Sequence, residues 1–344
     1  MLTPKQVLFF TPVIEELKSE GCEVLATSRR YREVEPMARM QSLLLRYIGE
    51  RGGKDPADQL AASTRRQEEI IPIVKEFAPD VAISVASAVC ARVAYGLGTK
   101  HVAVNDSPHS EVAGRLSLPL SHHLLCPWVI PFGAWAKFGL SKSQITRYRA
   151  LDPAAWLKRK WVAGPIPKLD PGKKTITVRL EESQAPYLAR ADKKWTDVVL
   201  NSVAGAFPDC NLVALCRYGD QLEETNRKFG DRFIVPAEVV DGRTLLCSTD
   251  VFVGMGGTMS AESALMGVPT ISTFQGSLFT EKYLMSVRLL TRATKVQSLT
   301  KCARRFLGES YKRDYSKRAE RVLASMEDPV PKIARSLIEA SKQG

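Results

Sequence analysis

Short apolar segments alternate with longer amphipathic segments along most of this 344-residue chain. The apolar segments have the length of buried strands and lie at residues 23–26, 43–48, 81–85, 101–104, 175–180, 211–216, 233–235, 251–253 and 270–273. Between them, apolar residues recur with helical spacing. Strands that alternate with helices form parallel sheets, because each helix returns the chain to the same edge of the sheet. The sequence therefore predicts an α/β fold.

The length and the proline content divide the chain into two domains. A chain of this size exceeds one ordinary hydrophobic core, and residues 160–174 are rich in proline and glycine, as a linker would be. We predict a Rossmann-like domain over residues 1–163, a linker over 164–174, a second Rossmann-like domain over 175–310 and a helical tail over 311–344. The first domain opens on a helix, so we expect either that it lacks its first strand or that the natural start lies upstream.

Composition excludes several classes of protein. The chain carries 49 Lys and Arg against 37 Asp and Glu, a net charge of +12, and the excess gathers at residues 137–160 and 288–321 rather than in a basic domain that binds nucleic acid.

Seven scattered cysteines without a Cys-x-x-Cys pair argue against a disulfide framework or a zinc site. The sequence has no Asp-x-Asp motif and no metal-binding histidine spacing, so we expect neither a metal nor a cofactor. Without a signal peptide, and with prolines interrupting the longest uncharged run, we expect a cytoplasmic protein.

The clearest chemical pattern spans residues 249–270. A strand-like run ends at Gly254, and Gly256, Gly257 and Thr258 lead into a short helix that contains Glu262. Glycines let the backbone approach a ligand, and a helix N-terminus offers unpaired N–H groups, so a pyrophosphate fits there. Glu262 lies one turn further on, where it can accept hydrogen bonds from ribose hydroxyls. The alternative is a tight strand–helix turn with a solvated glutamate.

This pattern, together with a Gly-Val-Pro at residues 267–269 and Thr280-Glu281, resembles the donor-nucleotide motif of glycosyltransferases of the B fold. Related enzymes are the transferase that adds N-acetylglucosamine to the lipid-linked cell-wall precursor and the non-hydrolysing UDP-N-acetylglucosamine 2-epimerase. More narrowly, the chain resembles a largely archaeal family of predicted B-fold glycosyltransferases of unassigned function. The residues that carry this second resemblance are Leu2-Thr3-Pro4, Phe9-Phe10, Asn105-Asp106, His109, Arg179, Arg217-Tyr218 and Gly256-Gly257-Thr258-Met259.

The resemblance implies two Rossmann-like domains facing across a cleft, with the acceptor on the N-terminal domain and a UDP-sugar donor on the C-terminal one. It also implies roles for the donor-binding residues: Glu262 for the ribose, Gly254, Gly256, Gly257 and Thr258 for the diphosphate, and Thr280 and Glu281 for the sugar. Two arginines, Arg179 and Arg217, each end a predicted strand, where α/β sheets bind ligands. A guanidinium there can offset the charge of a leaving diphosphate, although surface salt bridges would also explain both residues.

The acceptor side needs a base that takes a proton from the attacking hydroxyl. Asp106, His109 and Glu111 follow the predicted strand at 101–104 and are the candidates for this catalytic role. A turn-forming aspartate and a surface histidine are the competing explanation. At the first turn of the chain, where better-known relatives carry a His or an Asp, this sequence has Lys5 and Gln6.

Residues 124–161 interleave aromatic side chains with seven cations. Such a segment suits the anionic inner face of a membrane, to which the protein would bind peripherally. The alternative is that the aromatic rings pack in the core while the cations form a solvated face. Nucleic acid is not expected here, because no recognised binding module accompanies the cations.

The sequence therefore predicts a glycosyltransferase that moves a sugar from a UDP-sugar to an unidentified acceptor, with a lipid-linked acceptor as one candidate, and that uses no metal. A nucleotide-sugar 2-epimerase is the first alternative. It is disfavoured because Lys282-Tyr283-Leu284 follows Thr280-Glu281 where the epimerase has Arg-Pro-Glu. A non-catalytic protein that binds nucleotide-sugars or anionic lipids is the second alternative.

Overall fold

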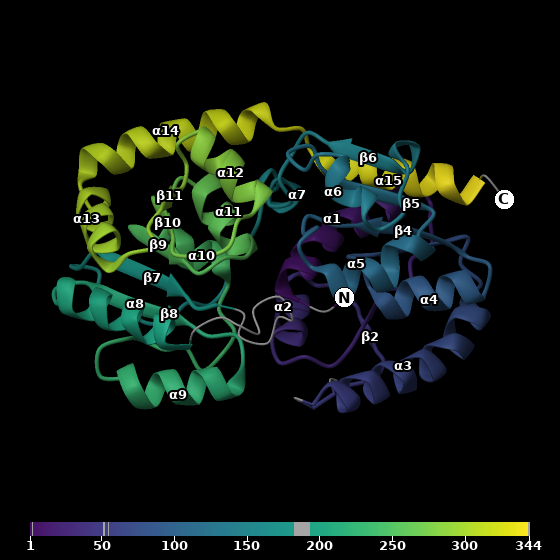
Figure 1. The fold of residues 1–344 in the computed structure, drawn as a ribbon, viewed down its shortest axis with the longest axis horizontal. Coiled ribbons are helices and arrows are strands. Elements are labelled where there is room, and N and C mark those ends of the chain that lie inside the picture. The colour runs from purple at the N-terminus through teal and green to yellow at the C-terminus, as the bar shows by residue number, and fades with distance from the viewer. Residues whose placement is uncertain (2, 51, 54, 182–192, 343–344) are drawn as a thin grey trace. The chain divides into compact units, whose positions relative to one another are not determined.

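The computed structural model describes residues 1, 3–50, 52–53, 55–181 and 193–342. The chain forms two compact units, each an α/β arrangement with parallel strands (Figure 1). Unit 1 comprises residues 1–158 and 327–344, and unit 2 comprises residues 159–326. None of the described helices is long and apolar enough to cross a lipid bilayer.

Unit 1 contains a four-stranded parallel sheet in the order β3-β4-β5-β6 and a separate parallel pair, β1-β2. Its strands are β1 (Thr27–Ser28), β2 (Arg46–Tyr47), β3 (Val81–Ser84), β4 (Lys100–Val104), β5 (His123–Pro127) and β6 (Ile145–Tyr148). Its helices are α1 (Pro4–Ser19), α2 (Val34–Met40), α3 (Pro56–Phe77), α4 (Ala88–Gly96), α5 (Glu111–Ser117), α6 (Gly133–Ala136), α7 (Ala154–Leu157) and α15 (Pro329–Lys342), with 3-10 turns at Leu118–Leu120 and Lys142–Gln144.

Unit 2 contains a five-stranded parallel sheet in the order β11-β10-β9-β7-β8. Its strands are β7 (Thr175–Arg179), β8 (Asn211–Leu215), β9 (Val251–Gly254), β10 (Thr270–Ser272) and β11 (Thr291–Arg292). Its helices are α8 (Lys193–Ala206), α9 (Gly219–Phe229), α10 (Gly242–Cys247), α11 (Thr258–Leu265), α12 (Phe279–Ser286), α13 (Val296–Phe306) and α14 (Glu309–Ser325). The α/β class predicted from the alternation is confirmed.

Helix α1 shows how local sequence fixes an element of unit 1. Thr3 Oγ1 accepts a hydrogen bond from the Gln6 backbone N–H at 3.3 Å, and Pro4 occupies the first helical turn, where its missing N–H costs nothing. Apolar side chains on α1 are buried almost completely, which makes this first helix part of the core. The helix thereby holds its second residue, Lys5, in a fixed position.

The two units differ from the predicted domains at the C-terminus. The predicted tail over 311–344 is divided, because α14 belongs to unit 2 whereas α15 packs on α1 in unit 1 (Figure 1). Val330, Ile333 and Leu337 form the buried face of α15. Residues 159–163, placed in the first domain by the sequence, belong to unit 2.

Several strand predictions also differ in extent. No strand forms at residues 23–26, because β1 begins only at Thr27, and within residues 43–48 only the two-residue strand β2 forms. The segment 233–235 forms a single bridge, from Ile234 to Val213, rather than a strand. These short segments lie at edges of the sheets, where they gain hydrogen bonds from one neighbour only.

We predict that Leu337→Ala destabilises unit 1 by about 2–4 kcal/mol, because it opens a cavity beneath α15. Leu337 is 2% exposed. Hydrogen exchange should show faster exchange of amides in unit 1 with little change in unit 2. The matched control is Arg335→Ala on the exposed face of the same helix, which should leave exchange nearly unchanged. Faster exchange confined to unit 2 would contradict the assignment of α15.

Candidate functional site

The turn after β9 has the backbone geometry of a close-approach site. Gly256 and Gly257 adopt φ angles of +92° and +89°, a region that side chains disfavour. A Cβ on Gly254 would lie 2.2 Å from Ser260 Oγ, and one on Gly256 would lie 3.0 Å from the Phe274 ring. Within the described chain no side chain caps α11, because its N-cap residue is Gly257. The first amide groups of α11 thus retain the capacity to bind an anion.

Glu262 lies on α11 with its side chain almost fully buried. Its Oε2 lies 3.7 Å from where a Cβ on Gly242 would be, so the carboxylate lies against the start of α10. Asp241 caps that helix by accepting a hydrogen bond from the Thr244 backbone N–H at 2.9 Å. Asp241 also forms a buried ion pair with Arg243, whose guanidinium stacks on the Trp161 ring. Glu262 is therefore not a solvated surface residue but is placed beside a rigid helix end.

Glu281 is a buried carboxyl group with spare hydrogen-bonding capacity. Its Oε1 accepts a hydrogen bond from Ser272 Oγ at 2.8 Å, and its Oε2 is buried without a partner. Burial raises the pKa of Glu281, against the opposing effects of the Ser272 hydrogen bond and Arg292. Thr280, its neighbour on α12, is half-buried. A ligand hydroxyl is the kind of group that could satisfy Oε2.

The two predicted arginines lie at the same edge of the unit 2 sheet as this turn. Arg179 is the last residue of β7, and the strand register pairs it with Gly254 on β9. Its Nη1 donates a hydrogen bond to the Leu215 carbonyl at the end of β8. Arg217 follows β8, with its guanidinium over the Tyr218 ring. The structure thus brings Arg179 to the turn and places Arg217 just past the neighbouring strand.

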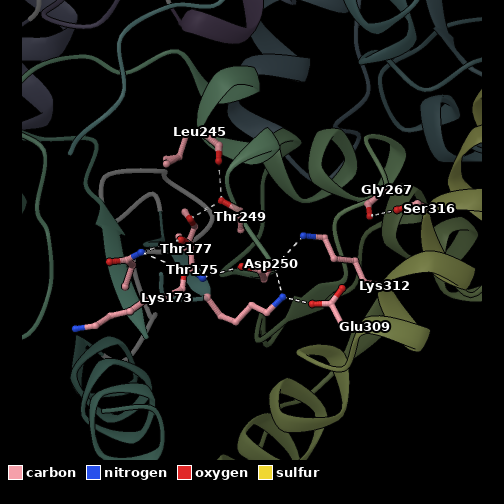
Figure 2. Close-up of polar contacts among 12 residues, drawn as sticks. Lys173, Thr175, Thr177, Leu245, Thr249, Asp250, Gly267, Glu309, Lys312 and Ser316 are labelled. Atoms are coloured by element: carbon pink, nitrogen blue, oxygen red, sulfur yellow. Dashed lines mark hydrogen bonds and ion pairs between the residues drawn. The ribbon is translucent and has the colours of Figure 1, made fainter. Parts of the chain in front are cut away.

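At the opposite, amino-terminal edge of this sheet the charges are already paired (Figure 2). Asp250 accepts hydrogen bonds from the Thr175 backbone N–H and from Lys312 Nζ, each at 2.8 Å. Lys174 bridges Asp250 and Glu309. A cavity of about 810 Å³ opens here, lined by residues 166–175, 247–248, 250 and 312. We interpret this edge as a structural junction, because Lys174 and Lys312 are engaged by carboxylates.

In unit 1 the three candidate bases lie in different environments. Glu111 is exposed and forms ion pairs with Lys137 and Arg115, which makes it poorly suited to take a proton. Asp106 Oδ2 lies 2.6 Å from Lys5 Nζ. His109 is half-buried; burial lowers its pKa, an effect that Asp106 opposes, so the ring is mostly neutral at pH 7.

Sequence reasoning missed three members of this cluster. Lys5 Nζ lies 2.8 Å from Asp152 Oδ2, and Asp152 Oδ1 accepts a hydrogen bond of 2.6 Å from the Tyr148 hydroxyl. Burial alone would lower the pKa of Lys5, but Asp106 and Asp152 outweigh it and raise that pKa. A signal existed, since Asp152 is the one acid among the cations of residues 137–160.

The aromatic segment at 124–161 mostly packs inward. Trp135, Phe138, Tyr148 and Trp156 are buried. Phe132 is half-buried beneath two cations, with Arg147 at 4.0 Å and Lys142 at 5.1 Å from its ring centroid. These rings are therefore engaged within the protein, as the core-packing alternative expected.

A family model described as "Protein of unknown function (DUF354)" matches residues 2–342. An uncharacterized protein of Methanocaldococcus jannaschii is 26% identical over 297 residues, covering 81% of this chain and 82% of that protein.

Solved structures share the fold over nearly the whole chain. A candidate UDP-N-acetylglucosamine 2-epimerase from Listeria monocytogenes superposes with a TM-score of 0.76 at 12% identity, covering 100% of this chain and 96% of that one. The UDP-GlcNAc 2-epimerase of M. jannaschii, solved with UDP-GlcNAc and UDP, gives 0.67 at 14% identity, covering 94% and 97%. The glycosyltransferase of kitacinnamycin gives 0.63 at 14% identity, covering 98% and 97%. The predicted B fold of glycosyltransferases (GT-B) is therefore confirmed.

We predict that Glu281→Gln stabilises unit 2 at pH 7.5 by about 1–3 kcal/mol, because it replaces a buried, incompletely bonded carboxylate by a neutral amide. The folded-state pKa is raised, so the cost of ionisation is absent at low pH and grows as pH rises through the folded value. The gain should thus disappear near pH 4. Urea unfolding at both pH values measures it, with Glu238→Gln as an exposed control. An equal gain at both pH values would contradict this account.

Proposed function

The chain belongs to the DUF354 family, and we propose that it is a glycosyltransferase that moves a sugar from a UDP-sugar donor to an acceptor hydroxyl. The observation that carries this proposal is the turn after β9, where two positive-φ glycines precede an uncapped helix that holds a buried glutamate. An anionic diphosphate suits the N-terminus of α11. A ribose suits Glu262, whose carboxylate can accept from both hydroxyls.

The other residues at this edge fit the rest of the donor. Arg179, aligned with Gly254 in the sheet, can neutralise a phosphate, and Arg217 can add a second positive charge from the end of β8. Glu281 has a buried oxygen available for a sugar hydroxyl, and Thr280 lies beside it at the start of α12.

The proposed reaction is a displacement at the anomeric carbon. The acceptor oxygen forms a bond to that carbon as the bond to the UDP oxygen breaks. His109 takes the proton of the acceptor hydroxyl, because its half-buried ring is mostly neutral near pH 7 and Asp106 stabilises the cation that forms. The α11 amides and Arg179 stabilise the negative charge that develops on the leaving UDP.

A lipid-linked acceptor is supported by the surface next to this base. Helix α5 directly follows the loop that carries His109, and it exposes Val112 and Leu116 one turn apart. Arg115 lies between them, and Lys137 approaches the same helix through Glu111. An apolar stripe flanked by cations suits an anionic amphiphile.

We predict that Glu262→Gln weakens UDP binding about 10- to 100-fold, because the ribose hydroxyls lose their charged acceptor. Isothermal titration with UDP measures the change. Glu238→Gln, which alters an exposed glutamate of the same unit, is the matched control and should bind as the unaltered protein does. Failure of the unaltered protein to bind UDP would overturn the donor assignment, and unchanged affinity in Glu262→Gln would overturn the ribose role.

A nucleotide-sugar 2-epimerase is the second candidate, because two epimerase structures superpose with TM-scores of 0.76 and 0.67, although a third gives 0.63, the same value as the kitacinnamycin enzyme. An epimerase acts on its nucleotide-sugar without an acceptor. We therefore expect UDP-N-acetylglucosamine, incubated with the protein alone, to keep its configuration at C2. Proton NMR of the sugar distinguishes the two epimers. Appearance of the 2-epimer would replace the transferase by this candidate.

A further inference from the structure

Lys5 is shared between two carboxylates that come from distant parts of unit 1. Its Nζ lies 2.6 Å from Asp106 Oδ2 and 2.8 Å from Asp152 Oδ2. The side chains of Lys5 and Asp106 are 18% and 16% exposed, and that of Asp152 is 3% exposed. One cation thus serves two carboxylates in a largely desolvated cluster, where charge interactions are strong.

Each carboxylate is fixed by a further hydrogen bond. The Tyr148 hydroxyl donates to Asp152 Oδ1 at 2.6 Å, and Ser107 Oγ donates to Asp106 Oδ1 at 2.8 Å. The Ser107 backbone N–H in turn donates to Asn105 Oδ1, which fixes the loop after β4. Neither carboxylate can therefore move toward Lys5 at the expense of the other without losing a partner.

The loop that holds Asp106 also holds His109. The Ser110 backbone N–H donates to the Ser107 carbonyl at 3.0 Å, which closes a tight turn between the two. Charged groups that act on His109 are Asp106, Lys5 and Lys137. Glu111 is engaged by Lys137 in an ion pair of 2.8 Å. Asp106 is thus the carboxylate that acts on the ring, and Lys137 and Lys5 are the cations that oppose it.

We propose that Lys5 is a positioning residue whose division between Asp106 and Asp152 sets how much negative charge Asp106 presents to His109. Asp152 draws part of the Lys5 charge away, so Asp106 is held in place without being fully neutralised. The proposal rests on the proposed function only in naming His109 as the base. It adds Lys5, Asp152 and Tyr148 to the acceptor side of the site.

The experiment follows the four histidines by NMR across pH in the whole protein, without any substrate. His109→Gln assigns the His109 signal. Lys5→Met should raise the pKa of His109 by about half a unit or more, because Asp106 loses its opposing cation. Asp152→Asn should lower it, because Lys5 then pairs with Asp106 alone. The exposed His122 is the internal control and should not move.

The two variants should shift the pKa of His109 in opposite directions. This difference distinguishes a positioning role of Lys5 from a general loosening of the loop. Loosening would expose His109 and raise its pKa in both variants, because burial lowers it in the native protein. Should Lys5→Met fail to fold, Asp152→Asn alone still decides the question. A rise or no change of the His109 pKa in Asp152→Asn overturns the proposal. The result is independent of UDP binding, so the failure of this proposal and that of the donor assignment are distinguishable.

Discussion

The hydrogen-bonded register of five parallel strands is the constraint on which the candidate site of unit 2 depends. The register aligns the ends of the strands in one row that runs Leu215, Arg179, Gly254, Ser272 and Arg292. Every parallel strand leaves its last residue at the same edge, so residues far apart in the sequence, such as Arg179 and Gly254, become neighbours. A shift of one residue would turn Arg179 to the other face of the sheet.

At this carboxyl-terminal edge of the sheet, some groups are destabilising in the folded protein. Glu281 keeps one buried oxygen without a hydrogen-bond partner. Two consecutive glycines, Gly256 and Gly257, adopt positive φ angles, and ordering glycines costs more conformational entropy on folding than ordering other residues. Arg292 Nη2 donates to the carbonyls of Phe274 and Gly276, which fixes the loop that covers the turn. Rigid support around incompletely bonded groups is typical of a site prepared for a ligand.

The sequence predicted the strand, turn and helix around Gly256 because the determinants of this conformation are local. The glycines, the helix start and Glu262 lie within nine residues, and each has a conformational reason for its place. The Lys5 cluster could not be predicted in the same way, since Lys5 and Asp152 are brought together only by packing of α1 and α7. Their position after the carboxyl end of β4 suggested Asp106, His109 and Glu111 alike, and nothing local distinguished one from another. The partition of α14 and α15 between units likewise depends on long-range burial, which periodicity does not contain.

The two edges of the unit 2 sheet contrast in how their charges are used. At the amino-terminal edge Asp250 is held between Lys312 and the start of β7, and Lys174 joins it to Glu309 on α14 (Figure 2). Burial would raise the pKa of Asp250, but Lys312 and the Thr175 amide outweigh it, so the carboxylate stays ionised and bonded. At the carboxyl-terminal edge the buried acid Glu281 has its pKa raised and an oxygen unbonded. The sheet thus anchors its helices at one edge through satisfied ion pairs, which leaves the other edge able to carry groups whose partners come from a ligand.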